Sequence, residues 1–354
     1  MKRGAVNEYL LAVGTYTEGT STGLYFYALE PEKEGFTPLS RIEVADPSYI
    51  AIGKDGKCVY TVTENPQPPA YANSFFIGKQ TGNLYRKSRK ETGGAGPCYI
   101  AADPEYRFVA TANYAGGSIS VFSLTKEGDI NSLSQIISFS GHGKDPERQE
   151  SPHIHCIGFS PENKYLFASD LGTDNIYRFD IEHDSQTIFL RESSLKSFPV
   201  EAGSGPRHFR FSPDGKYFYL INELSGTVMV FSYENGDIIQ RQKLPIPTKE
   251  GGDGGDIILT PDGKYLYASM REGSDGIGVF AVDRTSGLLT KTDYFRTAKH
   301  PRNLSISPDG RFLLCSAMKD NIIEVYSIDP DTGVPGKTNA RVKIDAPACT
   351  AFLY

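Results

Sequence analysis

Ser212-Pro-Asp-Gly-Lys-Tyr-Phe-Tyr219 is the stretch that decides the fold, because the same octapeptide returns along the chain. Its clearest copies are Thr260-Pro-Asp-Gly-Lys-Tyr-Leu-Tyr267 and Ser307-Pro-Asp-Gly-Arg-Phe-Leu-Leu314, and looser ones begin at Gly53, Asp103 and Ser160. Pro-Asp-Gly is turn chemistry, since Pro presets φ and Gly accepts a positive φ. The aromatic and β-branched residues that follow the turn predict a strand. A turn and strand that recur in this way indicate a repeat architecture.

Each copy lies inside a unit of four predicted strands. A short strand precedes the turn, as in 207–211, and two more follow it, as in 227–233 and 238–244. Four short antiparallel strands in about 40 to 50 residues are typical of one blade of a β-propeller. The chain has no tryptophan, so the Trp-Asp signature of WD40 blades is absent.

The number of blades follows from the residues that open the first strand of each unit. These are Pro47, Pro97, Pro152, Pro206, Gly255, Pro301 and Pro347. After Pro347 one strand remains, and strands predicted at 9–15, 23–29 and 36–44 complete that unit from the N-terminus. The sequence therefore predicts an all-β, seven-bladed β-propeller of four-stranded antiparallel blades, in a single domain over residues 1–354. A ring closed by N- and C-terminal strands in one blade leaves no open sheet edge, which favours it over rings of six or eight blades and over an open β-solenoid.

Composition argues against several kinds of partner. The chain carries 37 basic and 43 acidic residues, a net charge of −6 without a basic run, so nucleic acid is not predicted as a partner. No apolar run approaches the roughly 20 residues that span a bilayer, so no membrane partner is predicted. The N-terminus lacks the apolar stretch of a signal peptide, which predicts a cytoplasmic protein, although a chain trimmed of its signal would look the same. The oligomeric state is not indicated.

The five cysteines are scattered and show no paired spacing. Neither a zinc site nor a disulfide framework is therefore predicted. Four of the five fall in or next to predicted strands, which indicates buried apolar side chains.

A candidate site follows from the topology of a propeller. The loops that enter a first strand and leave a second strand lie on the same face, so their residues converge on one mouth of the central channel. The residues at the start of the first strands are Ser48, Cys98, His153, Arg207, Asp256, Arg302 and Ala348. Those near the end of the second strands are Glu64, Tyr114, Asp170, Glu223, Arg271 and Met318. Charged side chains rarely lie in half-buried positions unless they are paired, so this mixture of imidazole, guanidinium and carboxylate groups marks a candidate site.

The individual side chains allow more than one interpretation. His153 and His155 are two residues apart and are expected on one face of a strand, where they could form half of a metal site. No third ligand has a fixed spacing, so a polar lining of the channel is favoured and no metal is predicted. His208 follows Arg207 directly and is expected on the opposite side, which favours a structural role between blades. Arg207 and Arg271 are expected to contact a ligand, with structural salt bridges to carboxylates as the alternative.

Gly-rich segments and nucleophile motifs add little. Gly251-Gly-Asp-Gly-Gly-Asp256 matches one copy of a calcium-binding repeat that works in tandem, so a flexible loop is the favoured interpretation. Segments 92–97 and 113–118 are Gly-rich but do not join a strand to a helix as a P-loop does. No serine lies in Gly-x-Ser-x-Gly, and no cysteine shows a reactive setting, so nucleophilic catalysis is not supported.

Several of these motifs together resemble the lactonase family of seven-bladed propellers. They are Val13-Gly-Thr-Tyr-Thr17, Asn113-Tyr-Ala-Gly-Gly117, Ser151-Pro-His-Ile-His155, Gly205-Pro-Arg-His208 and Asn222-Glu223. The family includes bacterial propeller-type 6-phosphogluconolactonases and fungal carboxymuconate lactonizing enzymes, and the resemblance runs from about Leu10 to Tyr354. It implies lactone chemistry at the channel mouth, with no required metal or organic cofactor.

The resemblance also implies roles for particular residues. The residues matched as catalytic groups are His153, Arg207 and Glu223. Those matched as substrate contacts are Arg271, His155 and His208. Tyr114, at the channel mouth, is also expected to contact the substrate. In the resulting hypothesis the substrate is a small anionic lactone, 6-phosphogluconolactone, and the reaction belongs to carbohydrate metabolism and the pentose phosphate pathway. His153 would be the general base on water, the arginines would hold anionic oxygens or the oxyanion, and Glu223 would orient the histidine or balance an arginine.

Two other functions stay open at this point. A lactonizing cyclase acting on a muconate-like dicarboxylate would use the same two arginines. A non-enzymatic propeller that binds a ligand or a protein would not need the histidine and arginine set. The fold alone does not separate these functions.

Overall fold

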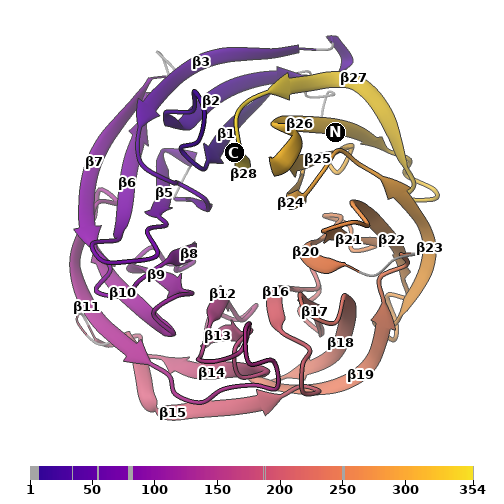
Figure 1. Cartoon of the computed structure of the whole chain (residues 1–354). Helices are drawn as coiled ribbons and strands as arrows, with labels where there is room; N and C mark the ends of the chain where they lie inside the picture. The colour runs from indigo at the N-terminus through magenta and orange to yellow at the C-terminus, as the bar shows by residue number, and fades with distance from the viewer. Residues whose placement is uncertain are drawn as a thin grey trace, which may run out of the picture.

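The computed structural model describes residues 8–33, 35–53, 56–78, 83–185, 187, 189–248 and 252–353. Seven four-stranded antiparallel sheets stand around a common axis in this part of the chain (Figure 1). Two short 3-10 helices, η1 (Pro31–Lys33) and η3 (Met318–Asp320), interrupt them. Over the described residues, every helix is too short to cross a membrane. The prediction of an all-β, seven-bladed propeller is confirmed.

The two inner strands of each blade carry the residues that face the axis. The first strands are β4 (Ile50–Ile52), β8 (Pro97–Ala102), β12 (Ile154–Phe159), β16 (Pro206–Phe211), β20 (Asp253–Leu259), β24 (Pro301–Ile306) and β28 (Pro347–Leu353). The second strands are β5 (Cys58–Thr63), β9 (Phe108–Asn113), β13 (Tyr165–Asp170), β17 (Tyr217–Asn222), β21 (Tyr265–Arg271), β25 (Phe312–Ala317) and β1 (Tyr9–Thr15). We call the face on which first strands begin and second strands end the mouth face.

The two outer strands complete each sheet toward solvent. The third strands are β6 (Tyr71–Ile77), β10 (Ser118–Leu124), β14 (Asn175–Ile181), β18 (Thr227–Glu234), β22 (Gly276–Val282), β26 (Ile322–Ile328) and β2 (Gly23–Glu30). The fourth strands are β7 (Leu84–Glu91), β11 (Ile130–Ser138), β15 (Leu190–Pro199), β19 (Asp237–Pro245), β23 (Leu289–Arg296), β27 (Pro335–Lys343) and β3 (Gly35–Glu43). Side-chain burial decreases from the third strand to the fourth strand of a blade. Third strands pack between neighbouring blades, whereas fourth strands expose most of their side chains.

The ring closes through a blade shared by both ends of the chain. β28 pairs antiparallel with β1, with Leu10 opposite Leu353 and Gly14 opposite Cys349. The sheet then continues through β2 to β3, and Figure 1 shows the strands of the two ends side by side. This pairing satisfies backbone groups that would otherwise form an open edge, and it confirms the predicted split blade.

The octapeptide forms both a turn and a contact between blades. In its first copy the Ser212 hydroxyl donates to Asp214 (2.6 Å), and Gly215 takes a φ of 72°. The hydroxyl of Tyr219 donates to the carbonyl of Gly287, in the β22–β23 hairpin of the next blade (3.0 Å). Gly287 itself has a positive φ, and a Cβ there would lie 2.2 Å from the ring of Tyr217. The repeat recurs because it fixes the turn and seats the next blade.

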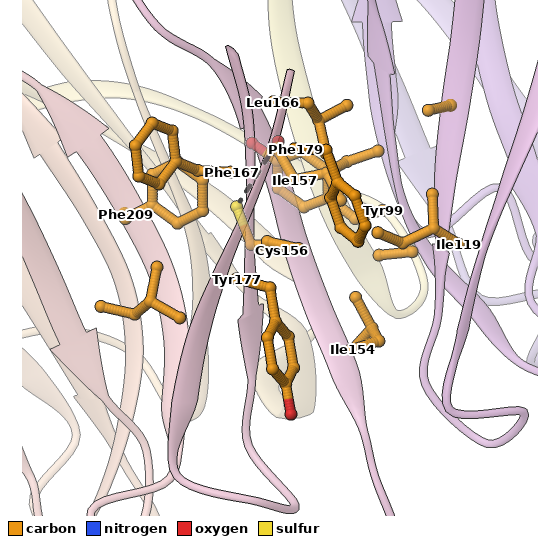
Figure 2. Packing of buried hydrophobic residues seen from close by; sticks show 14 of the residues in the cluster. Tyr99, Ile119, Ile154, Cys156, Ile157, Leu166, Phe167, Tyr177, Phe179 and Phe209 are labelled. Carbon is orange, nitrogen blue, oxygen red and sulfur yellow. Dashed lines mark hydrogen bonds between the residues drawn. The ribbon is translucent and has the colours of Figure 1, made fainter. Parts of the chain in front are cut away.

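The hydrophobic core lies between adjacent blades. Figure 2 shows one such region, where Cys156 and Phe167 of one blade pack with Phe209 of the next and Tyr99 of the one before. Fully burying a side chain of this size contributes about 1.5–3 kcal/mol. All five cysteines are free, buried and within strands, which confirms the expectation of buried apolar residues.

A β-bulge recurs near the start of the first strands, and its register shows that two residues take other positions than expected. The register shifts between Ile154 and Cys156 in β12, and between Pro206 and His208 in β16. His155, rather than the expected His153, is therefore equivalent to Arg207. In β20 the shift lies between Gly254 and Ile257, and Asp256 is fully buried between blades instead of standing at the mouth face. The expectation took Pro152 and Gly255 as equivalents of Pro206, whereas Ile154 and Gly254 hold that place in the register.

The same bulge corrects the expected placement of His208. Because Arg207 is the extra residue of the bulge, it does not lie on the side of β16 opposite His208. Its Nη1 atom is instead 3.2 Å from His208 Nε2. The two side chains are in contact, and Arg207 extends from His208 to the carboxylate of Glu223.

Candidate active site

Glu223, at the end of β17, is the centre of a cluster of three arginines. Its backbone N–H donates to the carbonyl of Gly205 (2.7 Å), which fixes it at the mouth face. Its Oε2 atom accepts from Arg207 Nε (2.8 Å) and lies 2.9 Å from Arg271 Nη2. Its Oε1 atom accepts from Arg148 Nη2 (2.5 Å). We call Arg148, Arg207 and Arg271 the arginine cluster.

The arginine cluster keeps Glu223 ionised, and its positive charge exceeds the negative charge of the neighbouring carboxylates. Burial alone would raise the pKa of Glu223, but Arg271 and Arg207 hold it well below its usual range. Burial lowers the pKa of Arg271 to about 10, so this guanidinium stays protonated at neutral pH. Asp253, 3.7 Å from Arg148, is the second carboxylate beside the cluster. Three cations against two carboxylates favour an anionic ligand, in a chain whose net charge is −6.

Arg207 is held in place from behind by His208 and Asp256. Arg207 is 1% exposed, and its Nη1 atom donates to the carbonyl of Gly255 (2.5 Å). Burial and the neighbouring Arg207 lower the pKa of His208 to about 3, so its imidazole is neutral. His208 Nδ1 lies 2.8 Å from the Asp256 carboxylate and must donate to it, because that carboxylate only accepts. Arg207 Nη1 lies 3.3 Å from His208 Nδ1 and 3.2 Å from its Nε2, and so packs against the neutral ring.

His153 lies just before β12 against Tyr114. Its backbone N–H donates to Asp170 (2.7 Å), and its ring stacks on the Tyr114 ring at 4.3 Å. Nδ1 lies 3.0 Å from the carbonyl oxygen of Tyr114, so Nδ1 carries the proton. Nε2, the second ring nitrogen, faces the partly exposed carboxylate of Glu150 at 3.3 Å.

His155 links the histidine side of the site to the arginine cluster. Its ring contacts Tyr114 at 5.4 Å, and its Nε2 atom lies 4.0 Å from Glu223 Oε2. Burial and Arg207 hold the pKa of His155 well below its usual range. Tyr114 also interacts with Arg148 and Glu223, and its burial raises its pKa. The structure therefore brings together His153, His155, Tyr114, Arg207, Glu223 and Arg271, all from the predicted set.

His208 differs from the other predicted substrate contacts. It is 3% exposed and lies beneath Arg207, with its ring against Tyr49, Tyr99 and His155. These contacts fit the structural alternative that the sequence also allowed. Its direct contact with substrate stays a prediction.

Arg148 is the member of the site that sequence reasoning missed. It lies in the long connection from β11 to β12, residues 139–153, which crosses the mouth face. The one available signal was the spacing of 55 residues from Pro97 to Pro152, the longest step between blades. Spacing shows an insertion but not where its side chains point.

A second polar group lies at the mouth face, where Arg302 also interacts electrostatically with Glu223. The Tyr16 hydroxyl donates to Glu64 (2.8 Å) and accepts from Arg302 Nη2 (2.5 Å). Arg302 lies over the Tyr16 ring, 5.0 Å from its centroid. Arg302 and Glu64 were both expected at this mouth, and they come from blades that meet across the closing blade.

The residues proposed for metal or calcium are engaged elsewhere. Over the described parts of the chain, three or more His, Cys, Asp and Glu side chains nowhere gather as a metal site would require. Of the segment Gly251–Asp256, Gly251 lies outside the described residues. Asp253 faces Arg148, and Asp256 accepts from His208 and Asn303, so both carboxylates already have partners.

Two cavities lie away from this chemistry. One of about 440 Å³ is lined by turn residues such as Pro261, Asp309 and Arg311, and another of about 560 Å³ by residues such as Arg107 and Lys126. Both lie at the Pro-Asp-Gly ends of the blades, opposite the mouth face. We place the site by the buried charges and hydrogen bonds instead, because these carry the chemistry.

Buried neutral histidines predict that acid destabilises the protein. In an unfolded chain histidine titrates near pH 6.5, whereas the folded pKa of His208 is about 3 and that of His155 is also lowered. Below pH 6.5 the unfolded state binds more protons, so the free energy of unfolding falls as the pH falls. Between pH 7 and pH 5 we expect a loss of about 2 kcal/mol from His208, and a loss of the same sign from His155.

Chemical denaturation at pH 7, 6 and 5 measures this effect. His208→Gln should reduce the dependence of the denaturation midpoint on pH, whatever its stability at pH 7. An unchanged pH dependence in that variant would mean that His208 carries its proton in the folded protein.

Comparison with known proteins identifies the family of the chain. Residues 10–352 match the family model described as lactonase, 7-bladed beta-propeller, so the chain belongs to this lactonase family. The expected resemblance is thereby confirmed. A Bacillus subtilis protein named 6-phosphogluconolactonase is 33% identical over 99% of both chains. A Formosa agariphila protein of the same name is 33% identical over 91% of this chain and 93% of that one.

Solved structures agree with the sequence relatives. A periplasmic gluconolactonase from Pseudomonas aeruginosa superposes with a TM-score of 0.91 at 31% identity, covering 98% of this chain and 99% of that one. A Bacteroides fragilis protein with a provisional 6-phosphogluconolactonase assignment gives a TM-score of 0.95 at 41% identity, with 100% of both chains covered.

Proposed function

We propose that this chain is a lactone hydrolase that converts 6-phosphogluconolactone and water into 6-phosphogluconate. The observation that carries the proposal is the arginine cluster around Glu223, joined through Tyr114 to a histidine with a basic Nε2 atom. This arrangement combines a general base with positive charge for an anionic substrate. Two relatives that match almost the whole chain are named for this activity.

His153 would be the general base. Its Nδ1–H bond to the Tyr114 carbonyl leaves Nε2, beside Glu150, to take a proton from water, and hydroxide then adds to the lactone carbonyl carbon. When the ring C–O bond breaks, the proton on Nε2 passes to the departing ring oxygen. The products are a carboxylic acid, which ionises in solvent, and an alcohol.

The arginines would stabilise the oxyanion of the tetrahedral intermediate. Arg271 Nε is buried and has no hydrogen-bond partner among the described residues, although Arg271 Nη2 is bound to Glu223 and to the Gly254 carbonyl. A buried N–H without a partner is costly, and an oxyanion that accepts from it would remove that cost at the transition state. Glu223 and Arg207 would hold Arg271 in position, while His155 and Tyr114 would line the substrate site.

Hydrolysis of a lactone transfers no electrons, so the proposed reaction needs no redox cofactor. The relatives' names favour hydrolysis over ring closure to a lactone. A sugar phosphate is an anion that crosses a lipid bilayer poorly, so the proposed substrate favours a cytoplasmic location and a role in the pentose phosphate pathway. One relative is named as periplasmic, and fractionation of cells that express this chain would decide its location.

The direct test is to mix the purified protein with freshly made 6-phosphoglucono-δ-lactone. Release of 6-phosphogluconate well above the spontaneous rate is the expected result, with glucono-δ-lactone and a muconolactone-type substrate as comparisons. Turnover of the muconolactone-type compound alone would favour the cyclase function. No acceleration with any of the three would overturn the proposal and leave a binding propeller.

A further inference from the structure

We infer that Arg148 contacts the phosphate of the substrate and makes the enzyme prefer a phosphorylated lactone to an unphosphorylated one. This inference rests on the proposed lactone hydrolase and names the residue that selects its substrate. Arg207 and Arg271, the anion contacts expected from the sequence, lie deeper in the protein. The inferred phosphate contact is instead Arg148, on a loop that the sequence analysis did not identify.

Exposure separates the three members of the arginine cluster. The side chain of Arg148 is 38% exposed, whereas those of Arg207 and Arg271 are 1% and 6% exposed. A phosphate is a bulky, strongly hydrated dianion that must be met from solvent. At the mouth face it reaches Arg148 without the displacement of protein atoms that Arg207 would require.

The hydrogen bonds of the cluster point the same way. Arg207 donates through Nε to Glu223 and through Nη1 to the Gly255 carbonyl, and Arg271 donates through Nη2 to the Gly254 carbonyl beside Glu223. Arg148 commits Nη2 to Glu223 Oε1 and also interacts with the Tyr114 hydroxyl. A guanidinium has five N–H donors in a fork that matches a phosphate. Arg148 can therefore bind a phosphate oxygen and keep its bond to Glu223.

Charge balance makes Arg148 the surplus cation. Oε2 of Glu223 already lies within 2.9 Å of both buried arginines, so its charge is neutralised without Arg148. The remaining carboxylate near Arg148 is Asp253, at 3.7 Å, which is too far for a hydrogen bond. A substrate phosphate would meet a cation that is only partly compensated.

The loop holds Arg148 in a defined place. Gln149, the next residue, is fully buried; its Nε2 atom donates to the Leu171 carbonyl (2.8 Å), and its Oε1 atom accepts from the N–H groups of Lys144 and Asp145. The backbone N–H of Arg148 donates to Asp145 Oδ1 (3.1 Å). These bonds tie the loop to the blade of β13. The side chain is therefore positioned before substrate arrives, which limits the entropy lost on binding.

The test compares Arg148→Met and Arg148→Lys with wild type on two substrates. For 6-phosphoglucono-δ-lactone we expect Arg148→Met to raise KM by about ten- to a hundredfold, the effect of a lost charge-assisted hydrogen bond, with kcat little changed. For glucono-δ-lactone KM should stay within about twofold of wild type. Arg148→Lys, which keeps the charge but not the fork, should fall between the two.

Lys144→Met is the matched control, because Lys144 lies on the same loop but packs beside Gly203. It should leave the preference between the two lactones unchanged. Thermal melting of Arg148→Met checks that the loop still folds. An equal rise in KM for both lactones, or no rise for either, would overturn the inference while the hydrolase proposal stands.

A failure of the proposed function has a separate outcome. If wild type hydrolyses neither lactone, titration calorimetry with 6-phosphogluconate and with gluconate replaces the kinetic comparison. Weaker binding of 6-phosphogluconate alone by Arg148→Met would still support Arg148 as the phosphate contact. Equal binding of 6-phosphogluconate by the variant and wild type would exclude it.

Discussion

His153→Ala should lower kcat for lactone hydrolysis by about 10²–10⁴-fold, the usual contribution of a positioned general base. The reason is the arrangement of the ring, whose Nδ1–H is held by the Tyr114 carbonyl so that Nε2 is the basic atom. KM should change much less than kcat, because the arginine cluster that would bind the anion is left intact. Initial rates with fresh 6-phosphoglucono-δ-lactone, corrected for spontaneous hydrolysis, measure the effect.

Two further measurements separate a base from a structural residue. Added imidazole should restore part of the activity of His153→Ala, and the variant should show the same circular dichroism and thermal midpoint as wild type. His183→Ala is the matched control, since His183 is a surface histidine beside Glu105. A loss of less than about threefold in His153→Ala would remove His153 from the mechanism and direct attention to His155.

Glu223→Gln should be the most destabilising single change at the site. It leaves the three guanidinium groups of the arginine cluster close together and without their shared counter-ion. Removal of one partner from a buried ion pair costs about 3–5 kcal/mol, because an uncompensated buried charge remains. The denaturation midpoint in urea should fall accordingly, and lactone hydrolysis should be lost with it.

The control for this prediction is a surface carboxylate in a simple ion pair. Glu201, 70% exposed and paired with Lys243, should tolerate replacement by Gln at a cost below about 1 kcal/mol. Glu223→Gln combined with Arg271→Met should regain part of the lost stability, because one of the unpaired cations is removed. A midpoint for Glu223→Gln equal to wild type would mean that the cluster is hydrated and that Glu223 does not hold it together.

Part of the candidate site could be predicted from position in the repeat. Topology places the residues before a first strand and after a second strand on one face, so Glu223, Arg271, Arg207 and Tyr114 were found by counting. Asp256 was placed wrongly by one position, and His153 was given the place that His155 takes. In both cases the residue assumed to open the first strand, Pro152 or Gly255, is not the equivalent of Pro206, because Ile154 and Gly254 take that place in the register.

Arg148 shows a second limit of the sequence. Its contact with Glu223 joins residues 75 positions apart, from a loop of one blade to a strand of the next. The loop has no repeated equivalent in the other blades, so no internal comparison could place its side chains. The folded chain alone shows that this arginine faces the same carboxylate as Arg207.

The amino-acid sequence by itself determined the number of blades, the closure of the ring and the face on which the site lies. These features repeat, and a repeated turn, strand period and spacing are local properties that can be read along the chain. Only the tertiary structure decided which charged side chains share Glu223 and which are buried behind them. Those choices depend on bulges and on contacts between blades, where one added residue redirects a side chain and local patterns carry no information.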